Sequence, residues 1–149
     1  MTEINGLRLA YRGFVTGLAA GYVWLATAML GAILAGVNPL APLQLLGGAG
    51  REGLLAGIGL LQVGSAGFGM TFAYFFGRYF TVRGTLAVAG PCFAGLAWML
   101  LLRLGLNPGG PQIQLAFLAA SLLYGAILGA GLPVRPEVER YSSVASPST

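Results

Sequence analysis

The sequence predicts an all-α integral membrane protein with four transmembrane helices, and three observations carry this prediction. Of the 149 residues, 56% are hydrophobic and only 8% are charged, whereas about a quarter are charged in soluble domains. A soluble domain of this size could not cover its surface with so few polar groups. The apolar residues run in blocks of about 20 or more, the length that a helix needs to cross the bilayer. These blocks lack the alternation of barrel strands.

The four apolar blocks define a transmembrane domain that we expect to extend over residues 13–133. Before it, residues 1–12 would form a cytoplasmic N-terminal segment, and after it, residues 134–149 would form a polar cytoplasmic tail. The first block is too long for the apolar core of a signal peptide and lacks a clean cleavage site, so we expect it to remain as a helix. The expected spans cover residues 13–37, 53–77, 84–104 and 113–133.

The arginines predict the orientation of the spans. With the N-terminus inside, only Arg51 and Arg103 lie on the outer side. The connecting loops are short, which is where the positive-inside rule works best, so we expect both termini in the cytoplasm. Arginines at span ends face anionic headgroups, so the net charge of +4 indicates lipid rather than nucleic acid as the partner. The six arginines on the inner side are Arg8, Arg12, Arg78, Arg83, Arg135 and Arg140.

The titratable residues argue against catalysis within the membrane. The sequence contains no His, Asp or Lys, and its four glutamates lie outside the apolar blocks. Metal sites, haem sites and intramembrane proton relays rely on His or carboxylate groups. The single cysteine, Cys92, cannot form an intrachain disulfide. We therefore expect no enzymatic activity, no metal site and no intrinsic cofactor.

The connection that follows the first span is too apolar for a free loop. Pro39 and Pro42 end the first span. The segment LQLL at residues 43–46 is expected to lie along the membrane interface. Contact with a partner protein is the alternative.

Small residues recur at helical spacing within the spans. Such residues leave a groove in which a second helix backbone can approach closely, so we expect Gly/Ala-mediated helix packing. The alternative is close approach of a bound lipid, quinone or pigment. The residues concerned are Gly13, Gly17, Gly21 and Gly31 in the first span, Ser65, Gly69 and Ala73 in the second, and Gly125 and Gly129 in the fourth.

Gln62 is the only amide in the second span. On a helical wheel it lies on the side of the small residues, which points it toward a neighbouring helix rather than toward lipid. By depth it lies level with Trp98, Ser121 and Thr27. We expect these four residues to form an interhelical polar cluster, and the alternative is a contact with a ligand carbonyl or a pigment.

Gly90 and Pro91 interrupt the third span. Proline lacks the N–H of a helical hydrogen bond and its ring crowds the preceding turn. We therefore expect a kink at this position.

The lack of reactive groups and the abundance of packing faces predict a non-catalytic accessory or structural subunit of a larger complex. We expect a complex of the bacterial inner membrane, of the respiratory or photosynthetic type, which is where such subunits commonly occur. The subunit would brace other integral membrane subunits and hold lipid, quinone or pigment, and a cytoplasmic partner would hold residues 134–149. The alternative is a small homo-oligomeric channel or carrier for an uncharged solute, with a pathway at Gln62 and Pro91.

Overall fold

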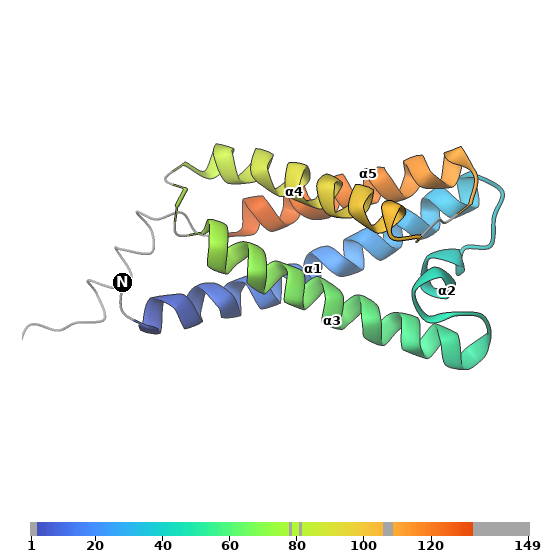
Figure 1. Ribbon diagram of the computed structural model, residues 1–149, viewed down its shortest axis with the longest axis horizontal. Coiled ribbons are helices and arrows are strands. Elements are labelled where there is room, and N and C mark those ends of the chain that lie inside the picture. The colour runs from blue at the N-terminus through green and yellow to red at the C-terminus, as the bar shows by residue number, and fades with distance from the viewer. Residues whose placement is uncertain (1–2, 78, 81, 106–108, 133–149) are drawn as a thin grey trace, which may run out of the picture.

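A computed structural model describes residues 3–77, 79–80, 82–105 and 109–132 of the chain. In this part all the regular structure is helical, and four of the five helices are long and apolar enough to cross a membrane. This confirms the prediction of an all-helical chain with four candidate membrane spans. The tail predicted at residues 134–149 and its expected partner lie outside the described residues. The helices are α1 (Glu3–Leu34), α2 (Ala41–Gly47), α3 (Gly50–Phe76), α4 (Arg83–Arg103) and α5 (Pro111–Gly131) (Figure 1).

The first helix begins earlier than the sequence suggested. It starts at Glu3 rather than at residue 13, so most of the segment expected before the span is part of the helix. Arg8 and Arg12 are good helix formers, and no proline interrupts this stretch. Apolarity marks where a chain enters the hydrocarbon, whereas a helix continues for as long as the backbone allows it. The other long helices begin and end within three residues of the predicted spans.

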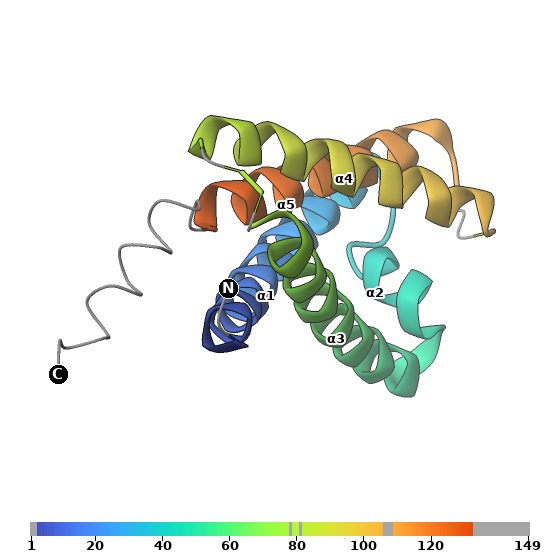
Figure 2. The same ribbon diagram turned by 60° about the vertical axis from the view of Figure 1, so that its left-hand side comes forward.

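The short helix α2 packs against the beginning of α3 (Figure 2). The side chain of Asn38 turns the chain after α1, because its Oδ1 accepts a hydrogen bond of 2.9 Å from the N–H of Leu40. Pro42 lies in the first turn of α2, where its missing N–H costs no hydrogen bond. Pro42 and Leu43 are buried. The apolar segment after the first span therefore covers the end of its own helix bundle.

The helix α1 packs against both α3 and α5, and α4 packs against α5. In both views α1 crosses α3 and its second half runs alongside α5, while α4 and α5 lie side by side (Figures 1 and 2). The helices α3 and α4 have no comparable backbone contact with one another. The backbones of α3 and α4 are therefore farther apart than those of the other neighbouring long helices.

The backbones of α1 and α3 approach closely at glycines. A Cβ atom added to Gly13 or Gly17 would clash with the backbone of α3, and one added to Gly21 would clash with the side chain of Ser65. The same holds from the other side, because a Cβ on Gly69 would clash with the backbone of Gly13. The small residues that meet in this contact are Gly13, Gly17 and Gly21 of α1 and Ser65, Gly69 and Ala73 of α3.

The contact between α4 and α5 has the same character. A Cβ atom on Gly90 would clash with the carbonyl group of Gly125, and one on Gly129 would clash with the carbonyl group of Leu86. Gly90, which the sequence suggested only as part of a kink, therefore lies at a helix contact. Pro91 follows it inside the continuous helix α4.

The contact between α1 and α5 also includes a glycine from the predicted set. A Cβ atom on Gly31 would clash with the Cβ atom of Ala116 in α5. Glycines therefore occur at each of the three close backbone contacts between long helices, α1–α3, α4–α5 and α1–α5.

The glycine contacts predict a position-specific effect of alanine. We expect Gly69→Ala to lower the free energy of unfolding by about 1–3 kcal/mol, because the new methyl group must displace backbone atoms of α1. In the matched variant Gly59→Ala the methyl group meets no atom within 4 Å, so we expect unchanged or slightly higher stability. Unfolding in mixed micelles, followed by circular dichroism, measures both. Equal effects of the two variants would contradict the prediction.

Candidate functional site

A cavity of about 280 Å³ lies among all five helices. Its walls are apolar, with Leu45 and Leu46 of α2 at one end and Phe68 of α3 among the residues that line it. It is open to the surface rather than enclosed. Five side chains that carry a polar group line it, namely Trp24, Ser65, Trp98, Ser121 and Tyr124. The cavity is therefore the candidate site of this molecule.

The hydroxyl group of Ser121 joins α5 to α1 in the wall of the cavity. It accepts a hydrogen bond of 3.1 Å from the indole Nε1–H of Trp24. Ser121 is only 7% exposed, so the bond satisfies two polar groups in an apolar environment. Trp24 also stacks on Phe117 of α5, with ring centroids 5.6 Å apart. The sequence predicts a cluster of Ser121 with the indole of Trp98 in α4, but in the structure the indole that bonds to Ser121 is that of Trp24 in α1.

Tyr124 joins α5 to α3. Its hydroxyl group donates a hydrogen bond of 2.8 Å to the backbone carbonyl of Ser65. A helical carbonyl has a second lone pair, so it can accept this bond in addition to the one within the helix. The hydroxyl group of Ser65 donates to the carbonyl of Gln62 in its own helix, at 3.2 Å. Tyr124 was not among the site residues predicted from the sequence, although a tyrosine at the middle of a span indicates that its hydroxyl group has a hydrogen-bond partner within the bundle.

Of the four residues that the sequence placed in one polar cluster, Trp98 and Ser121 both line the cavity, whereas Gln62 and Thr27 do not. Gln62 lies outside the cavity, where its Nε2 donates a hydrogen bond of 2.8 Å to the hydroxyl oxygen of Tyr22 in α1. The hydroxyl group of Thr27 donates to the carbonyl of Val23 in its own helix, at 2.8 Å. Equal depth did not bring these side chains together, because α1 rather than α4 or α5 packs on the side of α3 that carries Gln62.

Trp98 lines the cavity without a polar partner. Its ring packs against Phe117 at 5.5 Å, and its indole N–H donates to none of the described residues. The side chain is only 6% exposed. Among the described residues, every fully buried side-chain nitrogen or oxygen has a hydrogen-bond partner. Because the indole nitrogen of Trp98 has no partner among these residues, it is not fully buried, and a small molecule can reach it.

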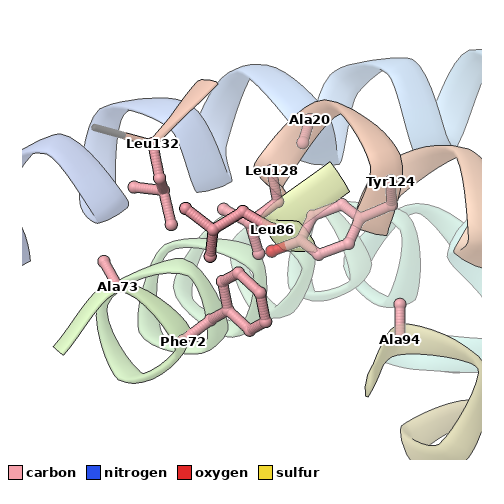
Figure 3. Packing of buried hydrophobic residues seen from close by; sticks show 8 residues of the cluster. All are labelled: Ala20, Phe72, Ala73, Leu86, Ala94, Tyr124, Leu128 and Leu132. Carbon is pink, nitrogen blue, oxygen red and sulfur yellow. The ribbon is translucent and has the colours of Figure 1, made fainter. Parts of the chain in front are cut away.

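Aromatic rings fill the space between α3 and α4 on the side of the cavity toward the end of α3. The ring of Phe93 in α4 meets Phe68, Phe72 and Phe76 of α3, with centroids 4.7, 5.5 and 5.5 Å apart. Figure 3 shows the core beside these rings, where Phe72, Leu86 and Tyr124 point toward one another from three helices. Side chains thus bridge the two helices at this level.

The described residues offer no group of three or more His, Cys, Asp or Glu side chains that could hold a metal ion. Cys92 is exposed on α4, away from the cavity lining. The site presents apolar walls, aromatic faces and hydrogen-bond donors. Comparison of the chain with protein-family models, with curated proteins and with solved structures gives no match.

The hydrogen bond of Tyr124 predicts a measurable loss in Tyr124→Phe. Interhelical hydrogen bonds in membranes contribute about 0.6 kcal/mol on average and up to about 1.7 kcal/mol, so we expect the free energy of unfolding to fall by this amount. Tyr79→Phe is the matched control, because Tyr79 is 73% exposed. Unfolding of both variants in mixed micelles tests the prediction, which a Tyr124→Phe variant as stable as Tyr79→Phe would refute.

Proposed function

We propose that the protein is a non-catalytic accessory subunit of a larger complex in the bacterial inner membrane, of the respiratory or photosynthetic type. In this complex it packs against helices of another integral membrane subunit and helps to hold them in place. The observation that carries the proposal is the hydrogen-bonded pair of Gln62 and Tyr22 on the outside of the bundle.

Both residues of the pair lie near the middle of candidate membrane spans, and the hydrocarbon of a bilayer offers no water to them. Gln62 is at the middle of α3, and Tyr22 is near the middle of the apolar stretch Gly6–Leu34. Their hydrogen bond uses one N–H of the amide and the hydroxyl oxygen. The amide oxygen, the second amide N–H and the phenolic proton have no partner among the described residues. Unpaired polar groups in hydrocarbon are costly, so a partner helix with polar side chains would lower the free energy.

The surroundings of the pair suit a second helix. Ala19 and Ala26 are exposed and flank Tyr22 on the same side of α1. On α3, Gly59 lies about one helical turn before Gln62. A Cβ atom added to Gly59 would meet nothing within 4 Å. Small residues around a polar pair allow close backbone approach, as is typical of contacts between membrane helices. We call this surface the outer α1/α3 face; it comprises Ala19, Tyr22, Ala26, Gly59 and Gln62.

We also propose that the glycine contacts hold the bundle together and that both termini are cytoplasmic. The α1–α3 and α4–α5 contacts support the first part, since they allow backbones to touch. The beginning of α1 and the end of α5 lie at the same end of the bundle (Figure 1). The excess of arginine at that end of the spans favours the cytoplasmic side for it.

The outer α1/α3 face predicts which variants lose the partner. We expect Gln62→Leu and Tyr22→Phe to reduce the amount of partner subunit that co-purifies from native membranes in mild detergent. One interhelical contact of about 0.6 to 2 kcal/mol corresponds to about 3- to 30-fold weaker association. Thr71→Val is the matched control: Thr71 follows Gln62 by nine residues, so it lies on the opposite side of α3. Quantitative mass spectrometry of the purified material gives the ratio of partner to protein.

Two outcomes of this experiment count against the proposal. The first is a Gln62→Leu variant that retains the same partners as Thr71→Val. The second is purification of this chain alone from native membranes. A stable homo-oligomer without other proteins would instead favour a small channel or carrier.

The orientation predicts opposite behaviour of two reporter fusions. A fluorescent reporter that matures only in the cytoplasm should be active after Thr149 and inactive after Gly109, between α4 and α5. A reporter that requires the outer compartment should show the reverse. Activity of the first reporter at both positions would contradict the expected four spans.

A further inference from the structure

We propose that the cavity binds a neutral, membrane-soluble ring compound that carries a carbonyl oxygen, the chemical class of quinones, and that this ligand enters from the bilayer between α3 and α4. The site is separate from the outer α1/α3 face, so the proposal does not depend on the accessory role.

The entrance follows from the arrangement of the helices. The backbones of α3 and α4 do not pack on one another, and the rings of Phe68 and Phe93 close the gap on only one side of the cavity. Leu60 of α3 and Leu101 of α4 line the cavity and are 55% and 39% exposed, so they stand at its edges. Since α3 and α4 are both candidate membrane spans, the opening faces hydrocarbon. A molecule dissolved in the bilayer can enter without crossing a polar layer.

The polar groups of the cavity determine what the ligand must contribute. Ser121 accepts a hydrogen bond from Trp24 but donates to none of the described residues, and the N–H of Trp98 donates to none either. Both side chains are more than nine-tenths buried and line the cavity. These donors face an apolar cavity, so an acceptor oxygen placed there would gain hydrogen bonds and lower the free energy. No charged side chain is among the lining residues, so the acceptor belongs to a neutral molecule.

The depth of these donors in the bilayer distinguishes a quinone from a phospholipid as the molecule that supplies the carbonyl oxygen. Ser121 is at the middle of α5, and half of the hydrocarbon core measures about 15 Å. The ester carbonyls of a phospholipid are held at the interface by the headgroup, so they do not reach this level. A quinone has no such anchor.

The size and the walls of the cavity agree with a ring. Its volume of about 280 Å³ is roughly twice that of an engineered cavity of about 150 Å³ that binds benzene. The aromatic faces of Trp24, Trp98 and Phe68 in the lining can stack on a planar ligand. A chain attached to the ring would leave through the opening between α3 and α4.

Intrinsic fluorescence tests the proposal directly, because the chain contains only two tryptophans and both line the cavity. The full-length protein in detergent is titrated with 2-methyl-1,4-naphthoquinone and, in parallel, with 2-methylnaphthalene, which lacks the carbonyl groups. We expect saturable quenching by the quinone and at least about 10-fold weaker binding of the hydrocarbon, measured by its competition with the quinone. Ser121→Ala, which removes one donor, should weaken quinone binding by about 3- to 30-fold.

A second pair of variants separates loss of the site from loss of the fold. Ala97→Phe places a ring in the cavity and should abolish saturable quenching, whereas Ala119→Phe, at an exposed position of α5, should leave it unchanged. Quenching that stays linear, or that is equal in all variants, would overturn the proposal. Equal affinity for quinone and hydrocarbon would overturn the role of the donors. Stoichiometric phospholipid in native mass spectra, lost in Ala97→Phe and not displaced by quinone, would show a lipid-chain site instead.

Discussion

The arrangement of this bundle depends on how closely α1 can approach its neighbours. At Gly13 and Gly17 the backbone of α1 rests on the backbone of α3, and at Gly31 it meets Ala116 of α5. One helix thus holds two others, and α4 is attached through α5 by an equivalent contact at Gly90 and Gly125. In a bilayer, where lipid tails are as apolar as leucine, such close contact is a main source of attraction between helices.

The cavity is a consequence of this attachment. Because α3 and α4 are each held by other helices, their backbones need not meet, and side chains fill the space between them. Phe93 and the phenylalanines of α3 fill one part of it. In the remaining part, Trp24 and Tyr124 make hydrogen bonds that join α5 to α1 and α3 across the wall. These bonds hold the walls in place without filling the space.

Two groups of polar side chains in the candidate membrane spans differ in where their hydrogen bonds lie. Tyr124, Ser65 and Ser121 form bonds inside the bundle, and these bonds secure the positions of the helices. Gln62 and Tyr22 form theirs on the outside, where further polar groups remain unpaired. The first group supports the walls of the proposed binding site, and the second supports the proposed contact with another subunit. Both rest on the same constraint, namely that hydrocarbon offers no hydrogen bonds to replace those of water.

The amino-acid sequence alone predicts the helical class and three of the four long helices to within three residues, because uniform apolarity over about 20 residues allows few other structures in a membrane. It could not determine which side chains meet. Gln62, Trp98 and Ser121 share a depth, but depth and helical angle leave the neighbour of each helix open. Only the packing of α1 between α3 and α5 assigned Tyr22 to Gln62 and Trp24 to Ser121. The cavity likewise depends on two helices, α3 and α4, whose backbones do not pack on one another although their side chains meet, which no local pattern encodes.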